Sequence, residues 1–289
     1  MRIASLIHNG HRRLGVVDDR GVRPVPDSAD IPDSLIDVLP ESEVLLERIS
    51  KSVADVPPIP LEDVSLLAPI PMPGKILAIG LNYRAHVAET GREVSPHQIW
   101  FNKQRTCIAG PHDHIDKPVA SDMVDYEGEL VVVIGKRCRH VPAERAHEVI
   151  AGYMVGNDVS VRDWQRRTPT MQMGKSFDTH GPIGPWMVTA DEIEDPQNLT
   201  IKTLVNGEER QSSNTSSMIH SIRDQIEHLT TAFTLEPGDL IFTGTPEGVG
   251  AAMDPPQFLK DGDVVRIEIG DMGAIENRVA DEVAKTIIG

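Results

Sequence analysis

A run of acidic residues leads directly into an apolar stretch near the middle of the chain. Residues 125–129 read Asp-Tyr-Glu-Gly-Glu, and residues 130–135 read Leu-Val-Val-Val-Ile-Gly. The apolar, β-branched run that ends in glycine predicts a buried β-strand. If this strand begins at Glu127, then Glu127 and Glu129 share one face, with their carboxylates roughly 7 Å apart. Two buried carboxylates side by side need a cation or a proton. The alternative is a later strand start that leaves both glutamates in solvent.

A third carboxylate is expected at the end of another buried strand. Residues 151–156 predict that strand, and Asp158 follows it closely. Oxygen ligands from Glu127, Glu129 and Asp158 suit a hard divalent cation, Mg²⁺ or Mn²⁺, rather than Zn²⁺. Three protein ligands on a six-coordinate ion leave about three positions for water and the two adjacent oxygens of a 2-oxo acid. An ion in that position would polarise the ketone of such a substrate.

An imidazole and a carboxylate are spaced as neighbours on a predicted helix. A buried strand over residues 75–80 is followed by Asn82, which we expect to cap a helix that carries His86 and Glu89. Residues three apart on a helix are adjacent on its surface. The pair is therefore a candidate general base with its orienting group. An ordinary surface pair is the alternative interpretation.

Further polar residues are candidates for contacts with a substrate. Residues 175–185 contain so many glycines and prolines that we expect an irregular loop, in which Lys175 faces a substrate oxygen or is simply solvated. Arg162 or Gln165 could hold a carboxylate or keto group. The loop over residues 244–250 lacks the lysine of a phosphate loop, which argues against a nucleotide site. Its backbone amides and the hydroxyl of Thr245 could instead bind a substrate carboxylate.

Charge and composition exclude several classes of partner. The formal net charge of −16, with no basic tract, argues against nucleic acid and against an anionic membrane. No apolar run approaches the length of a membrane span, and the first residues are too polar for a signal peptide. We therefore expect a cytoplasmic protein. Cys107 and Cys138 lack a metal-binding spacing and are expected to be free thiols.

The chain divides in sequence at a proline-rich segment. Residues 1–70 are expected to form a small N-terminal α+β accessory domain, which opens with a hairpin across Asn9-Gly10. Pro69, Pro71 and Pro73 mark the crossing into a main domain over residues 74–289. Late in that domain, Ser216-Ser217 are expected to cap a helix with a core-facing apolar stripe.

Four stretches, taken together and in order, resemble the fumarylacetoacetate hydrolase family. They are residues 125–130, 157–163, 174–178 and 243–250, and Asn82-Tyr83 with His86 and Glu89 is similar to its bacterial, acylpyruvase-like branch. The resemblance covers about residues 74–283. It implies an α+β fold whose catalytic domain is a mixed β-sandwich or β-roll, a Mg²⁺ or Mn²⁺ site, and a homodimer.

The resemblance also implies roles for individual residues. Glu127, Glu129 and Asp158 match the metal ligands, and Lys175 matches a lysine that faces the substrate. Substrate-side positions are matched by Arg162, Gln165 and Thr245, and we place Lys103, beside two aromatic residues, with them. His86 and Glu89 match a water-activating dyad on a lid that orders when substrate binds. The chain departs from the family where Lys103 is followed by Gln-Arg-Thr rather than proline-serine.

The resulting hypothesis is a metal-dependent hydrolase that cleaves a C–C bond of a 2,4-dioxo acid. The products would be pyruvate or a related 2-oxo acid and a carboxylic acid. The alternatives that keep the same site are an oxaloacetate-type decarboxylase and a 2-hydroxyhepta-2,4-diene-1,7-dioate isomerase. A metal-dependent 2-oxo acid binding protein without catalysis is the alternative outside enzymes.

Overall fold

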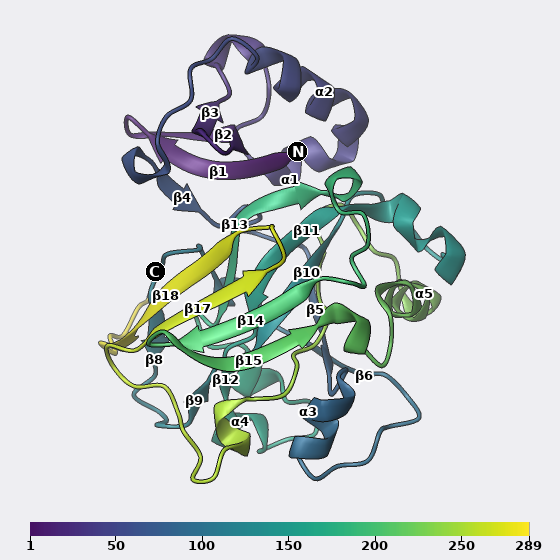
Figure 1. Ribbon diagram of the computed structural model, residues 1–289, viewed down its shortest axis with the longest axis vertical. Helices are drawn as coiled ribbons and strands as arrows, with labels where there is room; N and C mark the ends of the chain where they lie inside the picture. The colour runs from purple at the N-terminus through teal and green to yellow at the C-terminus, as the bar shows by residue number, and fades with distance from the viewer. Residues whose placement is uncertain (289) are drawn as a thin grey trace.

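Two β-sheets pack against each other through a shared hydrophobic core (Figure 1). The computed structural model of the chain describes residues 1–288. Over that range the strands form a sheet of eleven, a sheet of five and a separate pair, with short helices around them. The expected α+β class is confirmed.

The larger sheet mixes antiparallel and parallel neighbours, and nine of its strands follow one continuous order. In that order they are β3 (Gly21–Pro24), β2 (His11–Asp18), β1 (Arg2–His8), β13 (Gly181–Thr189), β11 (Ile150–Asn157), β10 (Gly128–Ile134), β16 (Leu240–Phe242), β5 (Ile76–Gly80) and β6 (Ile99–Asn102). Off this path, β4 (Ser65–Leu67) pairs with β1, and β7 (Ile108–Ala109) pairs with β13.

The smaller sheet lies in front of the larger one in Figure 1. Its strands are, in order, β15 (Glu208–Asn214), β14 (Thr200–Val205), β17 (Val264–Ile269), β18 (Ala274–Asp281) and β8 (Ile115–Lys117). The pair consists of β9 (Val124–Asp125) and β12 (Ser160–Val161).

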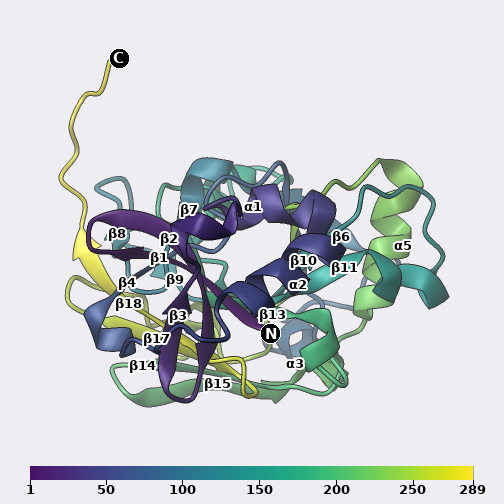
Figure 2. The same ribbon diagram turned by 90° about the horizontal axis from the view of Figure 1, so that it is seen from above.

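Five α-helices accompany the sheets in the described part of the chain: α1 (Leu35–Val38), α2 (Ser42–Ser52), α3 (Arg84–Glu89), α4 (Arg162–Gln165) and α5 (Ile222–Ala232). Helix α5 lies to one side of the sheets in Figure 2. No helix within residues 1–288 combines the length and the apolar character that a membrane crossing requires.

Strand β10 is buried on both faces, which explains its continuous apolar sequence. Leu130 and Val132 belong to the core between the two sheets, together with Ile267 of β17. Val131 and Val133 belong to a second core, which includes Leu35 of α1. A strand covered on both sides reads as an unbroken apolar run rather than an alternating one.

The N-terminal residues extend the larger sheet. The predicted hairpin is confirmed, since His8 lies opposite His11 across Asn9-Gly10. Both turn residues have positive φ, 51° and 77°, as a two-residue hairpin turn requires. Strand β1 then pairs with β13, with Ile3 opposite Met187, so the N-terminal elements (purple in Figure 1) continue the sheet of the main body.

Two local expectations from the sequence are wrong. The segment 175–185 is not entirely irregular, because β13 begins at Gly181 and is paired there with β7 and, from Ile183, with β11. Tertiary pairing thus overrides the local effect of glycine and proline. Helix α5 is capped by Ser221, not by Ser216-Ser217: its hydroxyl accepts from the Asp224 amide at 3.2 Å, and Asp224 reciprocates through the Ser221 amide at 3.0 Å.

Candidate active site

The pairing of β10 with β11 brings three carboxylates to one edge of the sheet. The strands are antiparallel with Gly128 opposite Asn157, so the start of one lies beside the end of the other. Glu127 and Asp158 therefore meet, and the Asp158 amide donates to the Glu127 carbonyl at 2.9 Å. Oxygens of Glu127, Glu129 and Asp158 all lie within 4.8 Å of one another. They are closer than the sequence spacing predicted, because β10 begins at Gly128 and the side chains converge.

These carboxylates are buried, so the interpretation that both glutamates lie in solvent is wrong. Glu127 is 5% exposed and Glu129 is 1% exposed. A lysine compensates part of the charge: Lys175 Nζ lies 2.6 Å from Glu127 Oε2 and 2.7 Å from Asp158 Oδ2. Burial alone would lower the pKa of Lys175, but Asp158 and Glu127 raise it above its usual value. Lys175 is therefore a buried ammonium and not a solvated surface charge.

Lys103 contacts the carboxylate cluster from a buried position. Its Nζ is 2.7 Å from Asp158 Oδ1 and also donates to the Lys175 carbonyl, and its side chain is fully buried. The residue is absent from the lining of the cavity described below. Lys103 therefore holds Asp158 and the turn that carries Lys175, and its placement on the substrate side stays a prediction.

Arg162 is anchored to two acids and keeps one nitrogen without a partner. Its Nε donates to Asp125 Oδ2 at 2.8 Å, and Nη1 donates to Glu127 Oε1 at 2.6 Å and to Gln165 Oε1 at 3.0 Å. Its Nη2 is buried and has no hydrogen-bond partner among the described residues. A buried donor without an acceptor is costly, so this atom is a candidate donor to a bound ligand.

The charges buried in the cluster do not balance. Four acids face three bases: Asp125, Glu127, Glu129 and Asp158 against Lys103, Arg162 and Lys175. Glu129 forms no ion pair with the described bases, and its Oε2 accepts only the Gly244 amide, at 2.7 Å. Burial, then Asp158 and Glu127, raise the pKa of Glu129 well above its usual value. Three converging oxygen donors with residual negative charge fit a divalent cation.

The predicted dyad is assembled on α3. His86 Nδ1 lies 2.6 Å from Glu89 Oε1, and Glu89 Oε2 accepts the Gly248 amide at 2.8 Å. His86 is only 6% exposed, so the pair is not an ordinary surface pair. A ring that donates through Nδ1 to a carboxylate keeps Nε2 as its free basic nitrogen.

Asn82 does not cap α3, contrary to the expectation from sequence. The residue before the helix is Tyr83, and no side chain caps it. The Asn82 amide instead donates to the Thr243 carbonyl at 2.8 Å, and its Oδ1 accepts the His220 amide at 2.8 Å. Asn82 thereby ties the approach to α3 to the end of β16.

One cavity of 810 Å³ connects these groups. It is lined by Glu127 and Glu129, by the dyad, and by the polar residues Arg162, Gln165, Lys175 and Thr245. Thr245 is already paired, since its hydroxyl donates to the Gly128 carbonyl at 3.0 Å and accepts from Gln211 at 2.8 Å. The cavity extends to exposed residues after α3 and α4, which include Arg92, Arg166 and Arg167.

Asp125 is a site residue for which sequence reasoning found no role. Its carboxylate accepts the Gly250 and Ala251 amides, both at 2.9 Å, in addition to Arg162 Nε. It therefore connects the loop that contacts Glu89 with the arginine that contacts Glu127. The only sequence signal was its position at the head of the acidic run.

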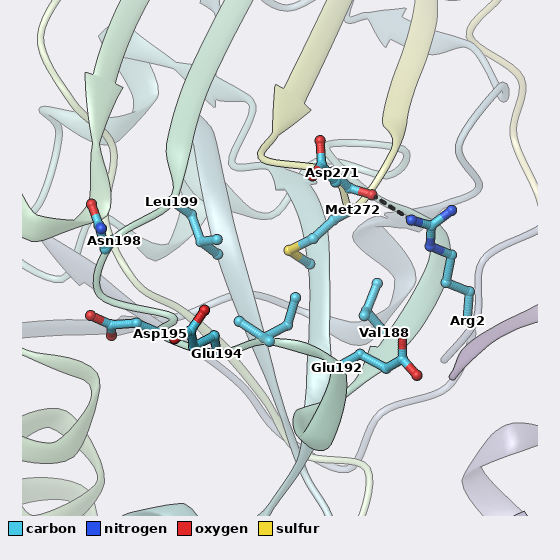
Figure 3. Close-up of a pocket in the computed structure, with 10 residues that line it drawn as sticks. Arg2, Val188, Glu192, Glu194, Asp195, Asn198, Leu199, Asp271 and Met272 are labelled. Carbon is cyan, nitrogen blue, oxygen red and sulfur yellow. Dashed lines mark hydrogen bonds between the residues drawn. The ribbon is translucent and has the colours of Figure 1, made fainter.

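A second cavity, of 480 Å³, lies at the other end of β13 (Figure 3). Arg2 donates there to the Asp271 carbonyl at 3.2 Å, beside Met272 and Glu192. Its lining shares no residue with the carboxylate cluster or the dyad. Glu127, Glu129 and the His86–Glu89 dyad line the 810 Å³ cavity instead.

Comparison with known proteins agrees with this geometry. Residues 75–280 match the family model described as fumarylacetoacetate (FAA) hydrolase, C-terminal. The chain is 48% identical over 232 residues to a fumarylacetoacetate hydrolase domain-containing protein 2 homolog of Dictyostelium discoideum, covering 76% of each. It is 41% identical to the mitochondrial oxaloacetate tautomerase FAHD2A of Bos taurus, covering 92% of this chain and 84% of that protein.

Among solved structures, the chain is similar to maleylpyruvate hydrolase from Sphingobium sp. SYK-6 in complex with manganese(II) and pyruvate. The TM-score is 0.82 at 33% sequence identity, covering 97% of this chain and 99% of the other. The family model spans most of the chain, and the carboxylate cluster lies within the matched residues. The chain belongs to the fumarylacetoacetate hydrolase family.

Proposed function

We propose that this enzyme hydrolyses a C–C bond of a 2,4-dioxo acid, releasing pyruvate or a related 2-oxo acid and a carboxylic acid. The observation that carries the proposal is that Glu127 and Glu129 of the carboxylate cluster line one cavity with the His86–Glu89 dyad. Binding of a 2-oxo acid head and activation of water then take place within the same enclosed space. The size of the cavity, 810 Å³, leaves room for a substrate longer than the 2-oxo acid head.

Glu127, Glu129 and Asp158 would hold the divalent cation, Mg²⁺ or Mn²⁺. When bound, such an ion polarises the adjacent oxygens of a 2-oxo acid. The manganese(II) and pyruvate in the maleylpyruvate hydrolase structure support both the ion and the head group. Lys175 and the unpaired Nη2 of Arg162 orient the substrate oxygens through charge-assisted hydrogen bonds.

His86 performs the proton transfer. Its Nε2 removes a proton from water, while Glu89 orients the ring and stabilises the imidazolium. The hydroxide attacks the distal carbonyl carbon, C4. The C3–C4 bond then breaks with its electron pair on C3, and C3 takes a proton. The products are the carboxylic acid from C4 onward and the 2-oxo acid from C1 to C3.

Tautomerisation of an oxaloacetate-type acid is the second candidate, and the 41% identity to the bovine oxaloacetate tautomerase favours it. The same His86 would then remove a proton from C3 of the substrate instead of from water. Decarboxylation and isomerisation of a dioxo-alkenoate would use the same head-binding groups. A 2-oxo acid binding protein without turnover is less well supported, because the dyad and Lys175 are both in place.

A substrate panel tests these reactions against one another. Purified protein with Mn²⁺ or Mg²⁺, and the same protein with excess chelator, would be given small acylpyruvates, enol-oxaloacetate and a dioxo-alkenoate. We expect metal-dependent release of pyruvate and a carboxylic acid from the acylpyruvates. Loss of enol absorbance alone would indicate the tautomerase, and carbon dioxide the decarboxylase. Binding of pyruvate without any turnover would exclude all the enzymatic candidates.

We also propose that the chain forms a homodimer and works in the cytoplasm. The dimer is what the family resemblance implies, and analytical ultracentrifugation would test it. The cytoplasmic location is the expectation from the sequence, whereas the bovine relative is named as a mitochondrial protein. Fractionation of cells that express the tagged protein would test the location.

A further inference from the structure

One buried side chain of the smaller sheet reaches the active site without lining its cavity. Gln211 lies on β15, the edge strand of that sheet, and is only 1% exposed. The other residues of β15 are exposed or partly buried, so the single buried position of this strand holds a polar amide. An apolar side chain is the usual occupant of such a position. A buried glutamine is tolerated there when its hydrogen bonds are made.

Gln211 uses its whole amide group in hydrogen bonds to the site. Its Oε1 accepts the Gly128 amide at 3.0 Å, and its Nε2 donates to Thr245 Oγ1 at 2.8 Å and to the Pro246 carbonyl at 2.9 Å. The backbone partners fix which way the amide faces, because the Gly128 N–H can only donate and the Pro246 carbonyl can only accept. Nε2 therefore faces Thr245 as a donor.

This orientation decides what the hydroxyl of Thr245 can do. Because Gln211 donates to Thr245 Oγ1, the single proton of that hydroxyl must point to another acceptor. It points to the Gly128 carbonyl, at 3.0 Å. Thr245 lines the 810 Å³ cavity, so a rotation of the hydroxyl offers the same proton to a ligand there. A carboxylate is a stronger acceptor than a neutral carbonyl and can take this proton over.

The same contacts hold the residue between two of the carboxylates. Gly128 separates Glu127 from Glu129, and both of its backbone groups are bound, the N–H by Gln211 and the carbonyl by Thr245. This close approach of the two sheets requires glycine, because a Cβ at position 128 would clash with a side chain of β14. Gln211 thereby fixes the Thr245 hydroxyl relative to the carboxylate cluster.

We propose that Gln211 is a positioning residue, which holds the Thr245 hydroxyl as a hydrogen-bond donor to the carboxylate of the 2-oxo acid head. The inference rests on the proposed function, because it takes that head to lie beside Glu127 and Glu129. Gln211 touches neither the substrate nor the ion. Its effect therefore passes through Thr245 and concerns the affinity for the head group rather than proton transfer by His86.

Binding of pyruvate at saturating Mn²⁺ tests the inference without turnover. Gln211→Met keeps the length of the side chain and removes its amide. We expect it to weaken pyruvate binding in calorimetry roughly fivefold, which corresponds to about 1 kcal/mol for one hydrogen bond. Thr245→Val should weaken binding by a similar factor, and the double variant should bind no more weakly than Thr245→Val alone. With an acylpyruvate the loss should appear in KM, while kcat changes little.

Gln197→Met is the matched control. Gln197 also accepts a backbone amide, from Ile222 at 2.6 Å, and donates to a backbone carbonyl, that of Thr215 at 3.0 Å, and it does not line the cavity. Both methionine variants should lower Tm, because each leaves backbone groups without a partner. Only Gln211→Met should weaken pyruvate binding. If that variant does not fold, Gln211→Asn, whose amide is one methylene shorter, should weaken pyruvate binding in the same direction.

Three outcomes would overturn the inference. They are an unchanged pyruvate affinity in the Gln211 variant, losses that add up in the double variant, and an equal loss of affinity in Gln197→Met. If the wild type binds pyruvate and the Gln211 variant binds it equally well, the head site stands and only the role of Gln211 fails. Absence of pyruvate binding by the wild type would overturn the proposed function as well.

Discussion

At the scale of single residues, the buried side chains of the site hold one another in place by shared ion pairs. Lys175 contacts both Glu127 and Asp158, and Arg162 contacts both Asp125 and Glu127. Removing one partner from such a pair leaves an uncompensated buried charge, which costs about 3–5 kcal/mol. Variants at these positions therefore change stability and activity together, so a loss of activity cannot be assigned to the chemistry alone. The dyad, which is less deeply buried at Glu89, is the better place to probe chemistry.

Substitutions in the His86–Glu89 dyad should lower activity. His86→Ala should lower kcat by about 10²–10⁴-fold, the usual contribution of a positioned general base, and Glu89→Gln should lower it in the same direction. KM should change little, because neither residue is needed to hold the 2-oxo acid head. Steady-state kinetics on an acylpyruvate measures both. Glu93→Gln, an exposed carboxylate on the same segment, is the control. Full activity in both dyad variants would refute the role.

Burial of His180 should make the stability of the fold depend on pH. The ring is fully buried, its Nε2 donates to the Asp116 carbonyl at 2.8 Å, and burial lowers its pKa to about 3. The unfolded state, with a pKa near 6.5, therefore takes up a proton first as the pH falls. The free energy of unfolding should therefore decline below about pH 6.5. His180 alone should account for a loss of about 2 kcal/mol at pH 5.

Urea denaturation at pH 7 and pH 5 measures that decline. His180→Gln keeps a donor for the Asp116 carbonyl and should show a smaller loss between the two pH values, even if it is less stable at both. His97→Gln, an exposed histidine, should lose as much stability as the wild type. An unchanged loss in the His180 variant would show that acid sensitivity arises elsewhere.

At the scale of secondary-structure elements, strand pairing determines where functional groups lie. The register of β10 with β11 brings the carboxylates together. On the other side of β10 lies β16, and the loop that follows it supplies the Gly244 amide to Glu129. The loop after β16 reaches further, because Gly248 binds Glu89 and Gly250 binds Asp125. One loop thus supports both the dyad and the arginine of the cluster.

The cap of α5 gives a prediction at this scale. Ser221 and Asp224 form a reciprocal pair of side chain to backbone hydrogen bonds at its first turn. Ser221→Ala should lower the free energy of unfolding by about 1 kcal/mol, as for other N-cap serines. Chemical denaturation measures the change. Ser217→Ala, an exposed serine in the preceding 3₁₀ turn, should change stability by less than half as much. Equal effects would contradict the assignment of the cap.

At the scale of the whole molecule, binding of a divalent ion should stabilise the fold. The ion would neutralise the unbalanced buried charge around Glu129, and a ligand at a hundredfold excess over its Kd adds about 2.7 kcal/mol. Thermal unfolding after chelation, and again after Mn²⁺ is restored, measures the effect. Glu129→Gln should reduce the metal-dependent rise in Tm, whereas the exposed Glu62→Gln should not. A Tm that is independent of metal in the wild type would contradict the metal site.

The division into an N-terminal domain of residues 1–70 and a catalytic domain of residues 74–289 remains a proposal. Ile3 and Leu35 share a core with Val131 and Val133, and β1 pairs with β13. A chain that begins at residue 74 should therefore be markedly less stable than the full chain, because it exposes this core. Circular dichroism and thermal unfolding of both chains measure the difference. Identical Tm values would show that the N-terminal part contributes nothing to the stability of the rest.

Features that depend on local pattern can be predicted from the sequence alone. The apolar run of β10, the strand β11, the Asn9-Gly10 hairpin and the spacing of His86 and Glu89 each have a signature within about ten residues. The carboxylate cluster could be predicted because each of its members ends or begins a recognisable buried strand. The family resemblance also depended on short motifs of this kind, and the family model confirmed it.

Contacts between side chains that are far apart in the sequence depend on tertiary packing. Asp125 and Gly250 are 125 residues apart and Asn82 and Thr243 are 161 apart, and no periodic pattern reports such contacts. The ion pair between Lys103 and Asp158 is a further example, because it joins residues 55 positions apart. Local sequence specifies the strand and the face, whereas the direction and partner of a side chain depend on how the sheets and loops pack.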